Sequence, residues 1–297
     1  MKIVIIGKTQ VTLAFIKALL NNNNFILSGV LTDKKKGEND DYIDLAKICK
    51  SKGIKYFKTD NINSKKSFHW IKSLSPNYIL CIGNSKIIRK PLLSKFQERI
   101  IGFHPTMLPN NRGKHPLIWS IILGLKNVGS TFFVMTNKID SGKILVQKKI
   151  KILNSDNANT LYTKVIKTAC SQIPKLYKSL LIKKKFFKNR KKVEGNVWRK
   201  RNFEDGIIDW RMSNYGIHNL IRALTKPYLG AKFVYKNKFY KVFNSKIHNL
   251  KSNKYQKEEH GKVLSVLKNE IIIKCGSGLI SVKNIYPKLK IKRGEYL

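Results

Sequence analysis

The sequence contains few cysteines, and their spacing matches no common motif. Cys49, Cys81, Cys170 and Cys275 are the four cysteines of the 297-residue chain, and no two of them form a CxxC pair. Zinc sites and disulfide frameworks need closely or regularly spaced cysteines. We therefore expect no bound metal, and reduced thiols in a cytoplasmic protein.

Long hydrophobic runs are also missing. No stretch approaches the roughly 18 apolar residues of a membrane-spanning helix. Residues 1–7 form a short apolar segment ending in glycine, whereas a signal peptide has a longer apolar core and a cleavage site. We expect a soluble protein without a membrane partner.

Acidic residues are scarce: 17 of them face 60 lysines and arginines, so the net charge is +43. Such an excess raises the question of nucleic acid. The lysines, however, are scattered through every segment, and a composition rich in lysine, asparagine and isoleucine is what an AT-rich genome encodes. Net charge bears on solubility and non-specific binding rather than on a specific partner. The charge alone therefore does not identify the function.

The first part of the chain alternates between buried strands and amphipathic helices. Apolar runs at 2–6, 25–31, 54–57 and 78–82 alternate with helical patterns at 11–20, 42–52 and 65–74. This alternation predicts a doubly wound, mostly parallel α/β sheet of Rossmann-like type. The turn at 7–12 matches neither GxGxxG nor a P-loop, so we expect no dinucleotide or nucleoside triphosphate site.

The pattern continues and then changes. The next predicted elements are a helix at 87–96, a strand at 98–103, a helix at 116–125, strands at 129–137 and 144–152, and one long helix at 160–182. A helix at 214–224 and five short strands at 231–235, 239–243, 263–267, 271–274 and 279–285 follow, which favour a small antiparallel, OB-like β-barrel. We predict a catalytic domain at 1–183, a basic linker at 184–204 and a C-terminal domain at 205–297.

Two loops carry side chains suited to proton transfer. His104 follows the apolar strand 98–103 and opens a loop that contains Pro105 and Pro109. Asp140 opens a second loop, Asp140-Ser141-Gly142, after another apolar strand. Open α/β sheets place their chemistry at the carboxyl ends of strands. A histidine and an aspartate delivered there form a candidate acid–base pair.

These motifs resemble those of a known family. His104 with Leu108-Pro109 and Arg112-Gly113, the Asp140-Ser141-Gly142 turn and the strand 78–83 are similar to the folate-dependent formyltransferases. That family includes methionyl-tRNA formyltransferases, glycinamide ribonucleotide transformylases and sugar N-formyltransferases. The region after residue 207 also resembles the C-terminal region of the tRNA and nucleotide-sugar members. The resemblance implies that an amine takes the formyl group of N10-formyltetrahydrofolate.

The resemblance also implies residue roles. His104 would stabilise the developing oxyanion and protonate the leaving nitrogen, and Asp140 would take the proton of the amine. The pterin slot would be lined by Cys81, Ile82, Gly83, Met107, Leu108, Pro109 and Ile139. The acceptor would be contacted by Thr106, Arg112, Gly113 and His115.

One position departs from the family pattern. The family has an asparagine two residues before the histidine, and here that position is Gly102. Loss of one oxyanion donor typically lowers the rate by ~10²–10³. Asn84, on a neighbouring strand end, and Thr106 are the candidate substitutes for this donor.

The acceptor amine defines the alternatives. The nucleotide-sugar members are the more similar group in sequence at residues 104–106, 114–116 and 204–210. These enzymes act in surface polysaccharide and lipopolysaccharide synthesis. The loop at 33–41 is short and partly acidic, whereas tRNA enzymes carry a longer basic insertion there. Methionyl-tRNA is the second acceptor, favoured by the +43 charge. A catalytically inactive RNA-binding module is a third interpretation, and the sequence leaves open whether the chain forms a homodimer.

Overall fold

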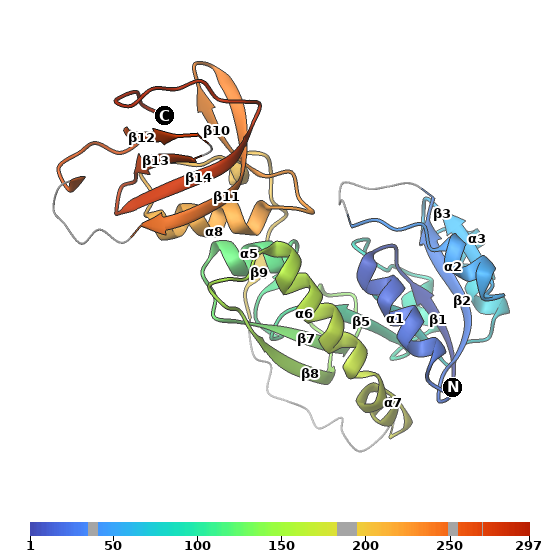
Figure 1. Cartoon of the computed structure of the whole chain (residues 1–297). Helices are drawn as coiled ribbons and strands as arrows, with labels where there is room; N and C mark the ends of the chain where they lie inside the picture. Colours follow the sequence, from blue (N-terminus) through green and yellow to red (C-terminus); the bar gives the residue numbers. More distant parts are fainter. Residues whose placement is uncertain (35–40, 183–194, 249–254, 269) are drawn as a thin grey trace. The chain divides into compact units, whose positions relative to one another are not determined.

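The computed structural model describes residues 1–34, 41–182, 195–248, 255–268 and 270–297. The chain divides into two compact units (Figure 1). One unit comprises residues 1–116, 128–150 and 163–199, and the other comprises residues 117–127, 151–162 and 200–297. Much of the predicted linker at 184–204 lies outside the described residues, which resume at Gly195.

The first unit is built on a seven-stranded sheet with the order β3-β2-β1-β4-β5-β7-β8. Its strands are β1 (Lys2–Ile6), β2 (Ile26–Asp33), β3 (Tyr56–Thr59), β4 (Tyr78–Cys81), β5 (Ile100–His104), β7 (Asn127–Val134) and β8 (Ile144–Lys151). The pairs from β3 to β5 are parallel, and β7 runs antiparallel to β5. The predicted mostly parallel α/β sheet is confirmed.

Several helices before residue 183 are shorter than predicted, including those predicted at 42–52 and 116–125. They are α1 (Gln10–Leu20), α2 (Ala46–Ser51), α3 (Lys65–Ser73), α4 (Leu92–Lys95), α5 (Pro116–Ile122), α6 (Ala158–Ser171) and α7 (Ile173–Leu181). The predicted single helix at 160–182 is wrong: it is two helices, because Pro174 has no N–H and its ring cannot continue a preceding helix. The predicted helix at 87–96 is only α4, since Pro91 excludes helical geometry at the residue before it.

The sheet is buried by apolar side chains from both the strands and the helices. Residues 3–6 of β1 are at most 1% exposed, which explains their uninterrupted apolar run. Helix α1 lies along the sheet (Figure 1) and packs Phe15 against Phe132 of β7, with ring centroids 5.6 Å apart. The Phe132 ring also packs on the ring of Phe103, the residue before His104, with ring centroids 5.0 Å apart. The strand that delivers His104 is therefore anchored in the core.

The amino end of α1 is closed by the chain itself. The Gln10 N–H donates to the Asp41 carbonyl at 3.2 Å, and Thr9 forms a capping box with Thr12. Gly7 is needed here because a Cβ atom would lie 2.0 Å from the Ile82 carbonyl oxygen. Amides that face a pyrophosphate in a dinucleotide site are thus engaged within the fold.

The second unit contains a five-stranded antiparallel sheet with the order β10-β11-β14-β13-β12. Its elements are the 3-10 turn η1 (Glu204–Gly206), α8 (Asn214–Leu224), β10 (Ala231–Tyr235), β11 (Lys238–His248), β12 (Val263–Leu267), β13 (Glu270–Lys274) and β14 (Leu279–Tyr286). Ser213 caps α8 by accepting the Gly216 N–H at 3.1 Å. Phe233 packs against Trp210 and stacks on Tyr240. The predicted smaller antiparallel C-terminal domain is confirmed.

Two very short strands were not predicted. β6 (Arg112–Gly113) pairs in parallel with β9 (Val197–Trp198), inside the segment predicted to be a linker. The described end of that segment is thus bound to the loop that follows His104. We refer to residues 195–198 as the strap.

The described residues also bear on membrane insertion and metal binding. None of their helices has the length and apolar character needed to cross a membrane. Their His, Cys, Asp and Glu side chains form no group of three or more that could hold a metal ion.

Candidate active site

His104 stands at the carboxyl end of β5 and is only 6% exposed. Its Nε2 lies 2.9 Å from the carbonyl oxygen of Asn111, in the loop that follows. A carbonyl can only accept a hydrogen bond, so Nε2 carries a proton and donates it. In the neutral ring, Nδ1 is then the nitrogen with the free lone pair.

Asp140 reaches His104 from the loop after β7. Its backbone is left-handed, with φ 45°, a conformation that aspartate tolerates better than most residues. Gly142 allows the loop to approach the sheet, since a Cβ atom there would lie 1.6 Å from the Val134 carbonyl oxygen. The Asp140 carboxylate accepts the Gly113 N–H at 3.0 Å and lies 3.6 Å from His104 Nδ1. The structure therefore brings the two predicted catalytic residues together.

Burial governs the protonation of this pair. Removal from water lowers the pKa of His104, while the Asp140 carboxylate and the hydrogen bond to Asn111 partly oppose this effect. His104 is therefore neutral at pH 7, with Nδ1 able to accept a proton. Once protonated, the imidazolium would be stabilised by the carboxylate beside it. The Asp140 side chain is 20% exposed and the His104 side chain 7%, so the pair is open mainly on the Asp140 side.

Gly102 is enclosed by apolar side chains. It pairs directly with Phe133 across the β5–β7 ladder. A Cβ atom on residue 102 would lie 2.7 Å from the Phe133 Cζ and 3.0 Å from the Met135 Cγ. The space that an asparagine side chain would need is therefore filled by the Phe133 ring.

The two candidate substitutes for that asparagine have local partners. The Asn84 side chain donates to the Lys86 carbonyl at 2.8 Å and accepts the Lys86 N–H at 3.2 Å, closing its own turn. Thr106 is 1% exposed, and its hydroxyl donates to the Asn110 carbonyl at 3.1 Å. Within the described part of the chain, neither side chain is hydrogen-bonded to His104 or Asp140, so an oxyanion role for them stays a prediction.

The loop expected to meet the folate is held firmly. The Gln147 amide donates to the Leu108 carbonyl at 3.0 Å, and the Thr131 hydroxyl donates to the Thr106 carbonyl at 2.6 Å. Leu108 is buried, whereas Met107 and Pro109 are half-buried. The shape of this loop is therefore preorganised by β7 and β8.

The other residues predicted to contact the folate are Cys81, Ile82, Gly83 and Ile139. Cys81 and Ile82 are buried at the end of β4, and burial raises the pKa of the Cys81 thiol to about 12, so it stays neutral. The Ile82 carbonyl accepts the Thr12 hydroxyl at 2.6 Å. Gly83 has φ 67° and packs on Thr9, while Ile139 is 49% exposed beside Asp140. Contacts of these residues with a folate stay predictions.

The residues predicted to contact the acceptor are partly engaged in the loop itself. The Arg112 Nη2 donates to the carbonyl of Gly195 in the strap. Gly113 has φ 100° and supplies the amide that holds Asp140. His115 is half-buried with φ 52°. Contacts of these residues with an acceptor stay predictions.

The contacts of Asn111, Asn196 and the strap with the site were not predicted from the sequence. Asn111 has φ 62°, and an asparagine before Arg-Gly is a weak turn signal that could have been noticed. Asn196 lies in a basic, low-information stretch, and nothing in the sequence pointed to it.

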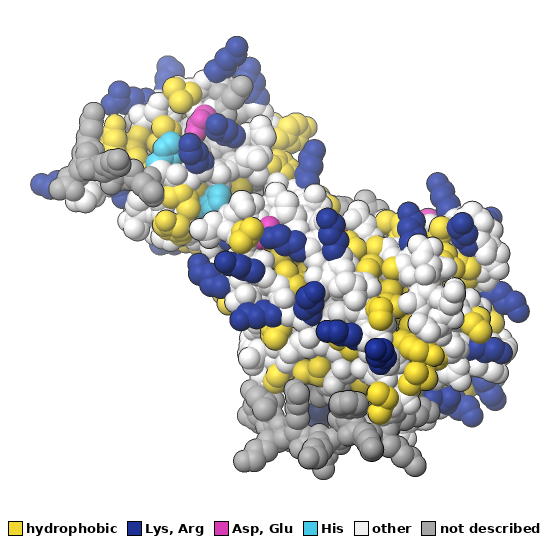
Figure 2. All heavy atoms as spheres, turned by 60° about the horizontal axis from the view of Figure 1, so that its bottom comes forward, with side chains coloured by type: hydrophobic (Ala, Val, Ile, Leu, Met, Phe, Trp, Pro, Cys, Tyr) yellow, Lys and Arg dark blue, Asp and Glu magenta, His cyan; other side chains and the backbone are white. Residues whose placement is uncertain are grey.

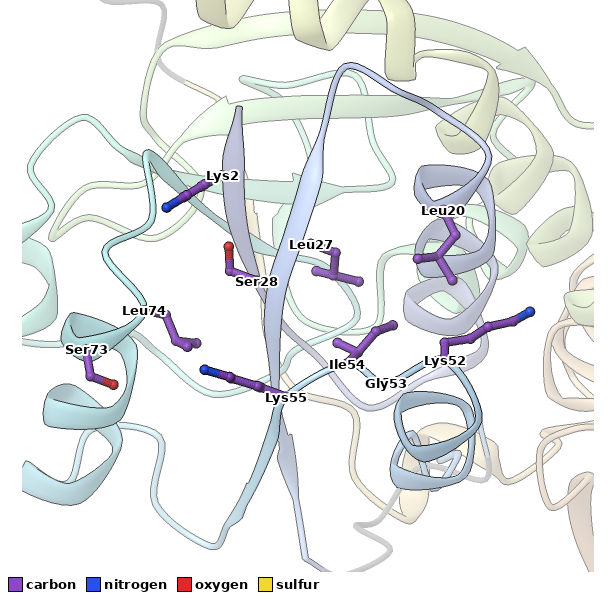
Figure 3. A pocket seen from close by; sticks show the side chains of 10 residues that line it. All are labelled: Lys2, Leu20, Leu27, Ser28, Lys52, Gly53, Ile54, Lys55, Ser73 and Leu74. Carbon is purple, nitrogen blue, oxygen red and sulfur yellow. The ribbon is translucent and has the colours of Figure 1, made fainter.

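A separate cavity lies at the opposite ends of the strands (Figure 3). Its volume is ≈ 490 Å³, and its lining includes Lys2, Leu27, Ser28, Lys55, Ser73 and Leu74. Lys2 and Leu27 stand at the amino ends of β1 and β2, whereas His104 stands at the carboxyl end of β5. This cavity is therefore not part of the His104–Asp140 site.

The structure brings a buried histidine at the end of β5 and a loop aspartate together, an arrangement suited to acid–base chemistry. Comparison with protein families is more specific. The model of the formyl transferase family matches residues 1–176, and that of the formyl transferase C-terminal domain matches residues 200–293. The chain belongs to the formyltransferase family.

Two curated relatives illustrate the range of the family. The chain is 28% identical over 303 residues to a methionyl-tRNA formyltransferase of Caldanaerobacter subterraneus subsp. tengcongensis, an alignment covering 100% of this chain and 96% of that protein. It is 35% identical over 202 residues to the bifunctional polymyxin resistance protein ArnA of Wigglesworthia glossinidia brevipalpis. That alignment covers 67% of this chain and 31% of ArnA.

Solved structures show the same fold. The sugar 3N-formyl transferase WlaRD, solved with dTDP and 5-N-formyl-THF, matches with a TM-score of 0.67 at 21% identity, covering 97% of this chain and 99% of WlaRD. An N-formyltransferase from Helicobacter canadensis, solved with folinic acid and dTDP-3-aminofucose, matches with a TM-score of 0.69 at 18% identity, covering 96% and 100%. The predicted enzyme class and the formyl-tetrahydrofolate donor are confirmed at the level of the family. The interpretation as an inactive RNA-binding module loses its support.

Proposed function

We propose that this formyltransferase acts on the amino group of a nucleotide-linked amino sugar. The observation that carries the proposal is the short connection after β2. Asp33 is held by Lys8 at 2.7 Å and by Lys86 at 3.0 Å, and the chain is already tied back at residues 41–43. There, Asp41 accepts the Gln10 N–H and Ile43 donates to the Lys8 carbonyl at 2.9 Å. Only residues 34–40 lie between these anchors, which leaves no long basic insertion of the kind that tRNA enzymes carry.

The distribution of charge agrees with a small substrate. On the face in Figure 2, lysine and arginine side chains are spread among apolar and uncharged ones rather than gathered in one continuous stripe. A nucleic-acid footprint is usually a clustered basic surface. This face therefore carries no such footprint.

Methionyl-tRNA is the second candidate acceptor. A specific finding favours it: a curated relative that aligns over the whole chain is a methionyl-tRNA formyltransferase. The assay below separates the two acceptors directly.

The site chemistry is the same for either amine. N10-formyltetrahydrofolate supplies the formyl carbon, which becomes bonded to the acceptor nitrogen while its bond to N10 breaks. An amine attacks only when neutral, so Asp140 would take its proton and relay it to the Nδ1 of His104. Protonated His104 would then face the negative charge on the formyl oxygen and return a proton to N10. Cys81, Ile82 and the residues of the 107–109 loop would line the slot for the pterin ring.

The test measures release of tetrahydrofolate from N10-formyltetrahydrofolate with a panel of nucleotide-linked amino sugars and, separately, with methionyl-tRNA. His104→Ala and Asp140→Ala should each lower turnover by at least ~10², and exposed His260→Ala is the matched control. Turnover with a sugar, lost in both site variants, would support the proposal. Turnover with methionyl-tRNA alone would replace the sugar by the second candidate. No turnover with either class, in protein that still binds folate, would overturn both assignments.

A further inference from the structure

The strap accepts hydrogen bonds from amides of the loop after His104, residues 105–115, which we call the catalytic loop. The Asn111 N–H donates to the Asn196 side-chain oxygen at 2.9 Å, and the Arg112 N–H donates to the Asn196 carbonyl at 3.1 Å. The Lys114 N–H donates to the Trp198 carbonyl at 3.1 Å. Among the amides of residues 111–114, the strap therefore takes all but that of Gly113.

The Gly113 amide and the Asn111 carbonyl of this loop are bonded to the two predicted catalytic residues. The Gly113 N–H donates to Asp140, and the Asn111 carbonyl accepts from His104 Nε2. A peptide group is planar, so an amide N–H shares its plane with the carbonyl of the residue before it. The Asn196 carbonyl, by accepting the Arg112 N–H, therefore fixes the Asn111 carbonyl that faces His104. The bonds to the Arg112 and Lys114 amides hold the residues on both sides of the Gly113 amide that faces Asp140.

The contact between strap and loop is also too close for larger residues. A Cβ atom on Gly195 would lie 2.0 Å from the Pro109 carbonyl oxygen, and one on Gly113 would lie 2.2 Å from the Trp198 carbonyl oxygen. A glycine on each side permits this approach. Both chain segments are therefore adapted to the same contact.

We propose that Asn196 is a positioning residue of the active site. Although exposed, it holds both peptide groups of Asn111, with its side chain on the Asn111 N–H and its carbonyl on the Arg112 N–H. His104 is thereby kept as the Nε2–H tautomer with Nδ1 directed at Asp140. The strap thereby makes the segment before the C-terminal domain a working part of the catalytic loop. This inference rests on the proposed roles of His104 and Asp140.

Three variants test the proposal. Asn196→Ala removes the acceptor oxygen, whereas Asn196→Asp keeps one at the same position. Gly195→Ala leaves Asn196 intact but forces the strap away from Pro109. Asn22→Ala is the matched control, because the Asn22 side chain also accepts a backbone N–H, at 3.0 Å, at the far end of α1.

The primary readout is the ¹⁵N NMR spectrum of the His104 ring, which needs no acceptor substrate. We expect the Nε2–H tautomer in the wild type and in Asn196→Asp. In Asn196→Ala and Gly195→Ala we expect mixed tautomers and a His104 pKa closer to 6.5, because looser packing admits water. In the formyl-transfer assay, kcat should fall by about 10- to 100-fold in these two variants, with less change in KM.

Each result has a clear meaning. The inference would be overturned by a His104 tautomer and kcat that are unchanged in Asn196→Ala, or by Asn196→Asp being as impaired as Asn196→Ala. If Asn196→Ala does not fold, Gly195→Ala and Asn196→Asp still decide the question. If no acceptor is turned over by the wild type, the acceptor assignment fails, while the NMR comparison still tests the role of Asn196.

Discussion

Phe133 lies directly across the β5–β7 ladder from Gly102, and its ring fills the space beside that glycine. Where the family has an asparagine side chain, this protein therefore has apolar core atoms and no empty space. In this site the negative charge on the formyl oxygen would rely on protonated His104 and on donors brought by loops or ligands. The exchange of an asparagine for a glycine thus changes both packing and electrostatics.

Restoring the asparagine alone should not restore a donor. Gly102→Asn would collide with Phe133, and overpacking of this kind typically destabilises a protein by about 1–3 kcal/mol. We expect a lower midpoint of urea unfolding and no gain in kcat. Gly102→Asn combined with Phe133→Val should recover part of the lost stability, which a double-mutant cycle measures. A single Gly102→Asn variant with wild-type stability and higher kcat would contradict this account.

The pH dependence of the reaction should report His104. Because burial lowers its pKa, kcat/KM should rise with pH through an inflection below 6.5 and then level off. Asp140 raises this pKa, so Asp140→Asn should move the His104 titration to still lower pH. NMR titration of the His104 ring measures the shift in that variant even without turnover. An upward shift would show that another group controls the pKa.

The same shift has a consequence for stability. The pKa of His104 is lower in the folded protein than the value of about 6.5 expected when unfolded, so the unfolded chain binds more protons between the two values. Its contribution is therefore fully present above pH 6.5 and is lost as the pH falls through the folded pKa. His104→Gln should flatten this part of the curve of unfolding free energy against pH. An equal slope in both proteins would argue against the assignment.

Replacement of Gly113, the glycine of the catalytic loop, is expected to lower activity strongly. Gly113→Ala adds a Cβ atom at φ 100°, 2.2 Å from the Trp198 carbonyl oxygen, and would displace the amide that holds Asp140. We expect kcat to fall by roughly 10²-fold, the effect of a misplaced catalytic group. Gly53→Ala is the matched control, because Gly53 has φ 63° with nothing within 4 Å. Comparable losses of activity in both variants would leave only backbone strain as the cause.

The ion pair at the ends of β1 and β2 should contribute to stability. Lys8 and Asp33 are both buried, with their charged groups 2.7 Å apart. Lys8→Met should lower the free energy of unfolding by about 1–3 kcal/mol, less than the ~3–5 kcal/mol of a fully isolated buried charge, because Lys86 still contacts Asp33. Lys34→Met is the control: its pair with Asp60, at 3.6 Å, is exposed and should matter by less than ~1 kcal/mol. Equal effects of the two substitutions, measured by urea unfolding, would be inconsistent with this view.

Much of the fold could be predicted because its signals are local. Apolar runs ending at Gly7 and Gly83 marked buried parallel strands, and the position of His104 after one of them pointed to the carboxyl edge of the sheet. The break between α6 and α7 was missed although Pro174 was visible, because the apolar stripe continues across it. A periodic pattern reports burial and does not report whether the backbone is continuous.

The sequence by itself determined the class of fold and the family, because apolar runs and short motifs are local signals, and it predicted His104 and Asp140 as the proton-transfer pair. Only the tertiary structure decided that Phe133 occupies the space beside Gly102, because that depends on the register of an antiparallel pair. Only the tertiary structure brought Asn196 to Asn111, through a bond from the Asn111 N–H to the Asn196 side chain and through the backbone pairing of β6 with β9. Contacts made by backbone groups between distant segments leave almost no trace in residue type, so they become visible only in the folded chain.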